Sequence, residues 1–543
     1  MAFLISAALV GLAALTDKGV SQEQFEYRPQ EEVPKRRKPM LEVTAPKLQI
    51  EQGPLYDIPA PDFVTADNER IARQLIEVEA TSKLFNDRNK AQEAQDPEIK
   101  KLLGIVTDFI RDKKLIIYGG SALSALLPPA DKFYDYSKEI PDYDFFSSNA
   151  QEDSMELADR FYAAGYKDTQ ARSGVHLNTF KVSGSFTQLA DISQLPVEIM
   201  EQMDVVKTED GLLVAGPLYL RIDLYKQLAE QNQPDRWPKV WKRMQLLNRN
   251  YPMPCMQESL KPMLCISAQR LPNSVLTDAV ISFIESKRGA NPLALPIVGS
   301  TLPELYERLE YKLSPELKAQ LNNFRCVPKE VAAIDLFSTT AKADAIEFTA
   351  RLQAQFPDLQ FKIITGPLAH EIFSERWIVT TQDGSRLVEF LLPDKCLAIT
   401  NVNGTYFGNL DTVLAVMFSK LFVDGKIVKE PTRGKQLCLM QYLMDAITLN
   451  AKYGADSGEF ARFPATCYGP VHTLREVFEE RWHQRVARMI AKHKAREEGK
   501  PIPEELGAPM FSYRPHDIAL AREGKIDQRM AEIDLGQGKM SMI

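Results

Sequence analysis

The chain has 543 residues, a hydrophobic content of 44%, a charged content of 26% and a formal net charge of -7. This length is too great for one hydrophobic core and predicts three folded parts plus tails, and the composition is that of an ordinary soluble protein. The negative charge argues against a protein that coats nucleic acid through bulk positive charge, so any RNA contact is expected from local basic patches.

The N-terminus begins with an uncharged run rich in Ala and Leu at residues 3–15. The run is shorter than the roughly 20 apolar residues that cross a bilayer, and it lacks the positive region of a secretory signal. A membrane or virion anchor, a buried docking helix and a fortuitous apolar start therefore remain open. Residues 17–61 carry many Pro, Glu and Gln residues and a basic cluster at 35–38, which predicts an extended linker.

Apolar residues recur near helical spacing between Thr65 and Arg111, with charged residues between them. This pattern predicts a helical segment that leads directly into a short apolar strand, Leu115 to Ile117. The strand ends in Gly119, Gly120 and Ser121, and a glycine pair allows backbone N–H groups to approach a phosphate. We therefore expect a phosphate-binding turn at these three residues.

Two carboxylates follow at Asp142 and Asp144, where apolar side chains alternate with acidic ones. Successive side chains in a strand point to opposite faces, so both carboxylates share one face. Oxygen ligands at this spacing suit Mg²⁺ or Mn²⁺. Asp191 is the best candidate for a third carboxylate because it lies between apolar neighbours on a later strand. His176, near the start of the strand before it, is interpreted as structural.

A glycine turn alone is usually only a turn, and two alternating aspartates are usually a solvated strand face. Their order along the chain, followed by a single aspartate, resembles the DNA polymerase β-like nucleotidyltransferases. One departure is the length of residues 122–141, where the segment Pro128 to Tyr136 would be an insertion at the mouth of the active site. This resemblance implies that Asp142, Asp144 and Asp191 are catalytic and metal-binding.

The residues after Asp191 make the resemblance more specific, because they resemble one family within these nucleotidyltransferases. Residues 211–217, residues 235–240 and Arg243 occur in the order found in the catalytic subunit of poly(A) polymerases from large cytoplasmic DNA viruses, of poxvirus, asfarvirus and giant-virus type. Residues 235–250 predict an amphipathic helix whose basic face is either simply solvated or in contact with phosphate. Because the resemblance places this helix at the active-site cleft, Lys239 and Arg243 are candidate nucleotide-binding residues.

A second α/β pattern follows a helical connector. The sequence predicts helices at 341–356 and 410–422 and strands at 361–365, 377–381 and 386–392. The order resembles a second, degenerate nucleotidyltransferase-like domain. In this interpretation Ile364 to Pro367 stand where the glycine turn would be, and Glu389 is an ordinary residue on the face of a sheet.

The C-terminal part contains a basic helix and then residues 499–543, which have no clear period and predict a flexible or partner-wrapping tail. The six cysteines lack C-x-x-C spacing, which fits a reducing compartment and neither a disulfide framework nor a zinc site. The sequence predicts an apolar segment (1–16), a linker (17–61), a helical domain (62–111) and a catalytic domain (112–255). After these it predicts a helical connector (256–335), a degenerate domain (336–470), a basic helix (471–498) and a tail (499–543).

The resemblance implies an α/β (α+β) protein whose nucleotidyltransferase-fold catalytic domain has a mixed sheet. It further implies a polynucleotide adenylyltransferase that extends RNA 3′ ends with ATP during polyadenylation, using two Mg²⁺ or Mn²⁺ ions. Family members work with a stimulatory subunit or as homodimers, and the expected location is the virion and the viral factory in the host cytoplasm.

Two alternatives stay open. One is another RNA nucleotidyltransferase, which acts on tRNA or adds a single nucleotide. The other is a non-catalytic virion or membrane-associated protein built on the nucleotidyltransferase scaffold, with residues 3–15 in contact with membrane or capsid.

Overall fold

The computed structural model describes eleven stretches of the chain and divides it into two compact units, residues 1–77 and 78–543. No helix within these stretches is long and apolar enough to span a bilayer. The apolar run 3–15 and the linker lie outside them, so their roles stay predictions. The described stretches are 65–176, 178–253, 273–289, 291–299, 333–369, 371–402, 404–424, 432–453, 464–471, 474–499 and 511–526.

The predicted helical segment forms α2 (Thr65–Gln95) and α3 (Pro97–Lys113). Asp96 caps α3 by accepting a hydrogen bond from the backbone N–H of Glu98 at 2.8 Å, and proline suits the first helical turn. The apolar face of α3 is fully buried at Leu102, Val106 and Phe109. This burial fixes α3 immediately before the first strand of the central sheet.

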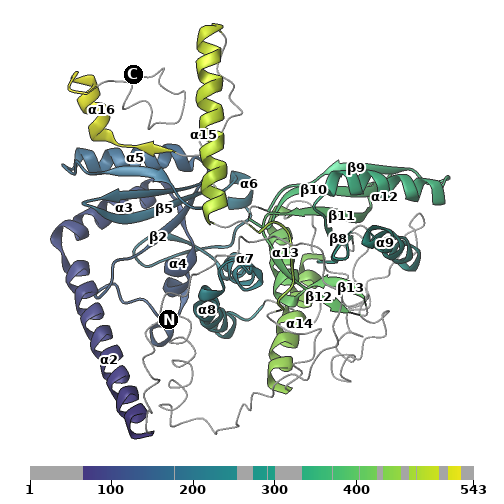
Figure 1. The fold of residues 1–543 in the computed structure, drawn as a ribbon, viewed down its shortest axis with the longest axis horizontal. Helices are drawn as coiled ribbons and strands as arrows, with labels where there is room; N and C mark the ends of the chain where they lie inside the picture. Colours follow the sequence, from purple (N-terminus) through teal and green to yellow (C-terminus); the bar gives the residue numbers. More distant parts are fainter. Residues whose placement is uncertain are drawn as a thin grey trace, which may run out of the picture. The chain divides into compact units, whose positions relative to one another are not determined.

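Eight strands form the central mixed sheet in the order β15-β3-β4-β5-β2-β1-β7-β6 (Figure 1). Neighbouring residues of β2 show which helices cover each face. Phe145 contacts Phe109 of α3, whereas Phe146 contacts Tyr219 of α7 (Pro217–Ala229), so these helices lie on opposite faces. The strands are β1 (Ile116–Ile117), β2 (Tyr143–Ser147), β3 (Gln170–Ser173), β4 (Thr179–Gly184), β5 (Thr187–Gln194), β6 (Val205–Lys207), β7 (Leu213–Ala215) and β15 (Ser512–Tyr513).

The edge strand β15 corrects the prediction for the C-terminal tail. Ser512 and Tyr513 pair with β3, and the Tyr513 hydroxyl donates to the Asp159 carboxylate at 2.6 Å. The helix α16 (Pro515–Arg522) follows. Prediction of a flexible tail was therefore wrong for residues 511–526, because a strand of two residues is too short to show a period in sequence.

The part of the chain from residue 273 onward, apart from β15 and α16, is called the second half below, and the part before it the first half. The second half contains a four-stranded sheet, β8-β11-β10-β9, and a three-stranded sheet, β13-β12-β14. The predicted second α/β pattern is confirmed, with helix and strand bounds close to those expected. The strands are β8 (Ile334–Phe337), β9 (Phe361–Thr365), β10 (Phe373–Thr381), β11 (Arg386–Pro393), β12 (Leu397–Val402), β13 (Thr405–Gly408) and β14 (Cys467–Tyr468). The helices are α9 (Asn273–Arg288), α12 (Ala341–Gln355), α13 (Leu410–Val423), α14 (Thr432–Tyr453) and α15 (Leu474–Glu497).

The two halves repeat one local structure. The Ser147 hydroxyl, at the end of β2, donates to Asp153 of α5 (Ala150–Ala163) at 2.5 Å. The Ser338 hydroxyl, just after β8, donates to Asp344 of α12 at the same distance. Each aspartate also pairs with a lysine near the end of an earlier helix. Asp153 pairs with Lys113 of α3 at 2.5 Å, and Asp344 pairs with Lys287 of α9 at 2.8 Å.

The glycine turn is also repeated, but not where the sequence suggested. A Cβ on Gly119 would lie 2.8 Å from the Asp144 Oδ2 atom, and one on Gly299 would lie 2.0 Å from the Asp335 Oδ2 atom. Gly299 is thus the counterpart of Gly119. The assignment of this role to Ile364–Pro367 was wrong, because that segment completes the edge strand β9 and the turn after it.

The second half contains a buried cluster of charges rather than a lone acid. Asp335 and Glu389 are paired on the parallel strands β8 and β11, and both side chains are fully buried. The Lys420 ammonium lies 2.6 Å from Asp335 and 3.0 Å from Glu389, and Arg376 donates to Glu389 at 2.8 Å. Interpretation of Glu389 as an ordinary sheet-face residue was therefore wrong.

Burial and the nearby cations set the protonation of this cluster. Burial raises the pKa of Asp335 to about 6. Burial alone would also raise the pKa of Glu389, but Lys420 and Arg376 overcome it and lower that pKa. Asp424 adds a third acid through a bidentate pair with Arg376 at 2.8 Å and 2.9 Å, and Arg386, 3.1 Å from Asp424, adds a third cation. The three acids and three cations thus compensate one another within the protein.

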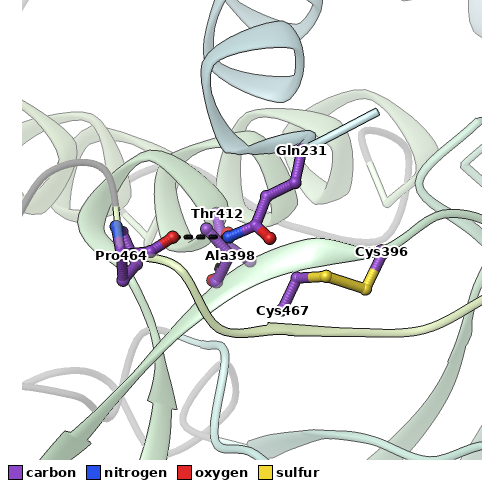
Figure 2. Close-up of a disulfide and its surroundings, with 6 residues drawn as sticks. All are labelled: Gln231, Cys396, Ala398, Thr412, Pro464 and Cys467. Atoms are coloured by element: carbon purple, nitrogen blue, oxygen red, sulfur yellow. Dashed lines mark hydrogen bonds between the residues drawn. A yellow bond between two sulfur atoms is a disulfide. The ribbon is translucent and has the colours of Figure 1, made fainter. Parts of the chain in front are cut away.

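A disulfide joins Cys396 to Cys467, with Cα atoms 5.2 Å apart, and Cys438 is disulfide-bonded as well. Figure 2 shows the first bond beside the strand end, where the Gln231 side chain donates to the carbonyl of Pro464. The prediction that the cysteines form no disulfide framework was wrong. Partners 71 residues apart are brought together only by the pairing of β12 with β14, which no local spacing reveals.

We expect Cys396→Ser to destabilise the second half of the molecule by about 4 kcal/mol, because the closed loop of 71 residues restricts the unfolded chain. Thermal unfolding followed by circular dichroism measures this loss. Reducing the wild-type protein with dithiothreitol should lower its midpoint toward that of the variant, and an unchanged midpoint in both cases would contradict a stabilising bond.

We expect Lys420→Met to cost about 3 kcal/mol at pH 7.5, because it leaves the buried Asp335 and Glu389 short of one positive charge. The loss should be smaller at pH 5, since the raised pKa of Asp335 lets that carboxyl take up a proton. Urea unfolding at the two pH values measures the difference. The matched control is Lys362→Met at an exposed lysine of β9, which should change little at either pH.

Candidate active site

The parallel pairing of β2 with β5 brings two of the predicted carboxylates together. Asp144 and Asp191 are direct partners in the register of these strands, so their Cα atoms are about 5 Å apart. Both side chains line one cavity of about 430 Å³, and Asp142 lines it as well. The three aspartates predicted from sequence thus meet in a single site.

Asp142 precedes β2 and is held through its backbone. The Ser121 hydroxyl donates to the Asp142 carbonyl at 2.7 Å and is buried. Ser121 therefore joins the glycine turn to the segment that carries the first carboxylate, but it does not line the cavity. Gly119 and Gly120 do line it, as the first residues of α4 (Gly119–Leu126).

The Asp144 carboxyl has a strongly raised pKa. Burial raises its pKa, and the negative charges of Asp142 and Asp191 raise it further. Among the described side chains none donates a hydrogen bond to it. A carboxyl group in this environment is stable only with a bound proton or a nearby cation. Such strongly shifted pKa values are typical of functional sites.

Asp191 is compensated differently. Its Oδ2 atom accepts from the Lys181 ammonium at 2.7 Å, and its Oδ1 atom accepts from the Gln188 amide at 2.8 Å. Burial raises the pKa of Asp191, and Lys181 opposes that increase. In the described stretches no three His, Cys, Asp or Glu side chains converge as ready metal ligands, and Asp191 is directed to Lys181.

A guanidinium group lies against the glycine turn. A Cβ on Gly120 would be 2.9 Å from Arg243 Nη2 and 2.7 Å from the Tyr134 hydroxyl, so only glycine leaves room for both. Arg243 donates to that hydroxyl at 2.6 Å and stacks over Phe133. The predicted insertion at residues 128–136 thus supplies an aromatic support for Arg243 at the cavity wall.

The helix α8 (Trp237–Asn250) presents basic side chains to the same cavity. Arg236, Lys239 and Arg243 follow one another at helical spacing, and all three line it. Burial lowers the pKa of Lys239, and the charges of Arg243 and Arg236 lower it further. Cations that repel one another in this way favour binding of an anion, which agrees with the nucleotide-binding role predicted for Lys239 and Arg243.

The remaining wall was missed in the sequence. One face of α7 carries Asp223, Lys226 and Gln227 into the cavity, at spacings of three and four residues. Lys226 pairs with Glu371 from the second half of the chain, and Glu371 also pairs with His176 at 3.1 Å. The spacing of Asp223, Lys226 and Gln227 on α7 was the only signal of this wall in the local sequence. Glu371 gave no such signal, because it reaches the site through tertiary packing.

Glu371 adopts a left-handed backbone conformation, with φ of 65°, which is uncommon for a residue with a side chain. Burial alone would raise its pKa, but Lys226 and His176 lower it. Aromatic contacts hold the two halves together at this wall, since Tyr219 of α7 packs on Phe422 of α13 with ring centroids 5.1 Å apart. The second half therefore completes the cavity.

The predicted basic helix is present as α15, but one of its arginines has a structural role. Arg481 is buried and donates to the carbonyls of Gly174 and Val175, the latter at 2.7 Å. Arg475 pairs with Glu479 on the helix surface. These two residues therefore support the fold, and the expected contact of the helix with RNA stays a prediction.

The site lies in a segment that has known relatives. Residues 104–233 match the family model of the poly(A) polymerase catalytic subunit. A protein of African swine fever virus is 34% identical over 170 residues, which are 30% of this chain and 36% of that protein. A protein of Acanthamoeba polyphaga mimivirus is 30% identical over 175 residues, which are 30% of this chain and 29% of that protein. Both are provisionally named poly(A) polymerase catalytic subunit, and the matched stretch spans about a third of their length.

The fold is similar to that of a solved protein over most of its length. The crystal structure of the Megavirus polyadenylate synthase matches with a TM-score of 0.62 and 21% identity, covering 87% of this chain and 90% of that one. The matches to relatives agree with the resemblance drawn from the sequence, and the likeness to the solved structure confirms the mixed α/β fold.

We expect Asp144→Asn to stabilise the folded protein at pH 8, because burial and the charges of Asp142 and Asp191 raise the pKa of this carboxyl. The folded chain retains a proton on Asp144 above the ordinary value of 3.8, so ionising this group costs stability as the pH rises. The difference between variant and wild type should narrow as the pH falls toward 4. Thermal unfolding from pH 4 to 8 measures it, with the exposed Asp358→Asn as control. A variant less stable than wild type at pH 8 would contradict the expectation.

Proposed function

We propose that this chain is the catalytic subunit of a viral poly(A) polymerase, which adds AMP from ATP to RNA 3′ ends. The observation that carries the proposal is the pairing of Asp144 with Asp191 in a cavity that Lys239 and Arg243 of α8 also line. Acids and cations in one cavity suit a reaction that brings an alcohol and a polyphosphate together. The match of residues 104–233 supports the choice of RNA and ATP as substrates.

The triphosphate is held by the cationic wall in this proposal. Arg243 lies against the turn at Gly119 and Gly120, where α4 begins and its first N–H groups are available to phosphate oxygens. Lys239 lies one helical turn before Arg243 and faces the same cavity. These groups neutralise the phosphates and retain the leaving pyrophosphate.

The carboxylates fit a divalent cation. Their oxygens are the ligands that Mg²⁺ and Mn²⁺ prefer, and the raised pKa of Asp144 marks a negative charge that the protein leaves uncompensated. Asp142, Asp144 and Asp191 would hold two such ions, which when bound lower the pKa of an RNA 3′-hydroxyl and neutralise the phosphates.

Asp191 accepts the proton of the 3′-hydroxyl in this mechanism. The alkoxide oxygen attacks the α-phosphorus of ATP in line, a new phosphodiester bond forms, and the bond to the bridging oxygen of pyrophosphate breaks. Orientation and fixed charge supply most of the rate, since the protein makes no covalent bond to the substrate. Preference for adenosine, a stimulatory subunit or homodimer, and a location in virion and host cytoplasm follow only from the resemblance and remain part of the proposal.

Purified protein with an RNA primer, radiolabelled ATP and Mg²⁺ tests the proposal directly. We expect long adenylate tails from the wild type, and a loss of rate on the order of a thousandfold or more in Asp144→Asn and Asp191→Asn. Asp358→Asn is the matched control and should extend the primer normally. Replacing ATP with the other nucleoside triphosphates measures base preference.

Other outcomes decide between the alternatives. Addition of a single nucleotide would indicate another RNA nucleotidyltransferase. Wild-type protein that binds no nucleotide and extends no primer would support a scaffold without catalysis, and full activity of Asp144→Asn would exclude the proposed site.

A further inference from the structure

The two halves of the molecule hold the same pair of acids with different cations. In the first half, Asp144 and Asp191 are partners on parallel strands, and in the second half Asp335 and Glu389 are partners on parallel strands. In each half a glycine turn lies directly against the first acid of the pair. The second half therefore serves as an internal reference for the first.

In the second half a lysine bridges both acids. Lys420 contacts Asp335 at 2.6 Å and Glu389 at 3.0 Å, and it is buried in α13. Since Arg376 also pairs with Glu389 at 2.7 Å, both carboxylates already have cations. This arrangement leaves no place for a divalent ion, which agrees with a half that has lost its catalytic site.

In the first half a lysine reaches only one of the acids. Lys181 is the cross-strand partner of Asp191 on β4, so Lys181, Asp191 and Asp144 lie in a row across three neighbouring strands. The Lys181 ammonium is 2.7 Å from Asp191 and makes no ion pair with Asp144, although its charge opposes the rise in the pKa of Asp144 that burial and the neighbouring acids cause. Both members of the ion pair line the cavity and are partly exposed, with side-chain exposures of 24% and 15%.

The partly exposed lysine can be displaced, whereas the buried one cannot. The Lys181 side chain is long and flexible, and the cavity that it lines gives its ammonium room to move. The Gln188 amide donates to the other oxygen of Asp191, so each oxygen of this carboxylate already has a partner, and a cation that binds there competes with the Lys181 ammonium.

We propose that Lys181 is a positioning residue that holds Asp191 while the site lacks a divalent cation and competes with that cation for the Asp191 carboxylate. The inference rests on the proposed function, because it assigns Asp191 to a metal. When a divalent ion binds, the displaced ammonium remains in the cavity beside the phosphates of the substrate, where its charge is again compensated. Binding of the divalent cation to the acids is thereby favoured when the polyphosphate is also bound, because the phosphates compensate the charge of Lys181.

Binding of Mn²⁺ alone to the full chain, followed by electron paramagnetic resonance of free Mn²⁺, tests the competition. We expect Lys181→Met to bind Mn²⁺ about tenfold more tightly than wild type, since the competing charge is gone. Lys181→Arg keeps the charge and should bind like wild type. The control Lys362→Met, at an exposed lysine outside the cavity, should also bind like wild type.

Thermal unfolding gives a second readout that is independent of activity. In EDTA, Lys181→Met should unfold at a lower temperature than wild type, because Asp191 has lost its counter-ion. Saturating Mn²⁺ should raise its midpoint more than it raises that of wild type, because the added stability grows with affinity.

The outcomes separate this inference from the proposed function. If wild type extends RNA and binds Mn²⁺ but Lys181→Met binds it equally or more weakly, the role of Lys181 is overturned and the polymerase stands. If neither protein binds Mn²⁺ and wild type extends no primer, both proposals fail. Tighter binding by Lys181→Arg would also overturn the role of Lys181, because the charge would then not be the competitor.

Discussion

The parallel pairing of β2 with β5 is the constraint on which the site depends. It places Asp144 and Asp191, which are far apart along the chain, side by side on one face of the sheet. Burial, the charge of Asp142 and then that of Asp191 raise the pKa of Asp144, so ionising this carboxyl costs stability. The hydrophobic core around α3, α5 and β2 must therefore outweigh a local cost that a bound cation or a proton relieves.

The repeat in the second half shows another solution to the same repulsion. Lys420 and Arg376 neutralise Asp335 and Glu389 inside the core, so the acids persist as structural ion pairs. The parallel strand pair that carries the acids is the same, yet the chemistry differs because the cations come from the protein itself. Function here belongs to the charges placed on the fold and not to the fold alone.

The two halves also depend on each other at the cavity. Packing of α7 on α13, the ion pair of Glu371 with Lys226 and the contact of Glu371 with His176 form a wall that neither half contains alone. The strand β15 from the C-terminal region lengthens the central sheet in the same way, by adding a distant segment to an exposed edge. Much of the site is thus assembled from segments separated by long stretches of sequence.

The sequence by itself determined the local elements and the type of chemistry. A glycine turn after a short apolar strand, alternating aspartates and helical periodicity have a local physical cause, so the sequence indicated Gly119, Asp144 and the basic face of α8. These residues line one cavity, and their roles stay predictions. Tertiary structure alone decided the partners of distant residues. The disulfide of Cys396 with Cys467 and the ion pair of Lys420 with Glu389 arise from strand pairing and packing, which no periodicity within either segment encodes.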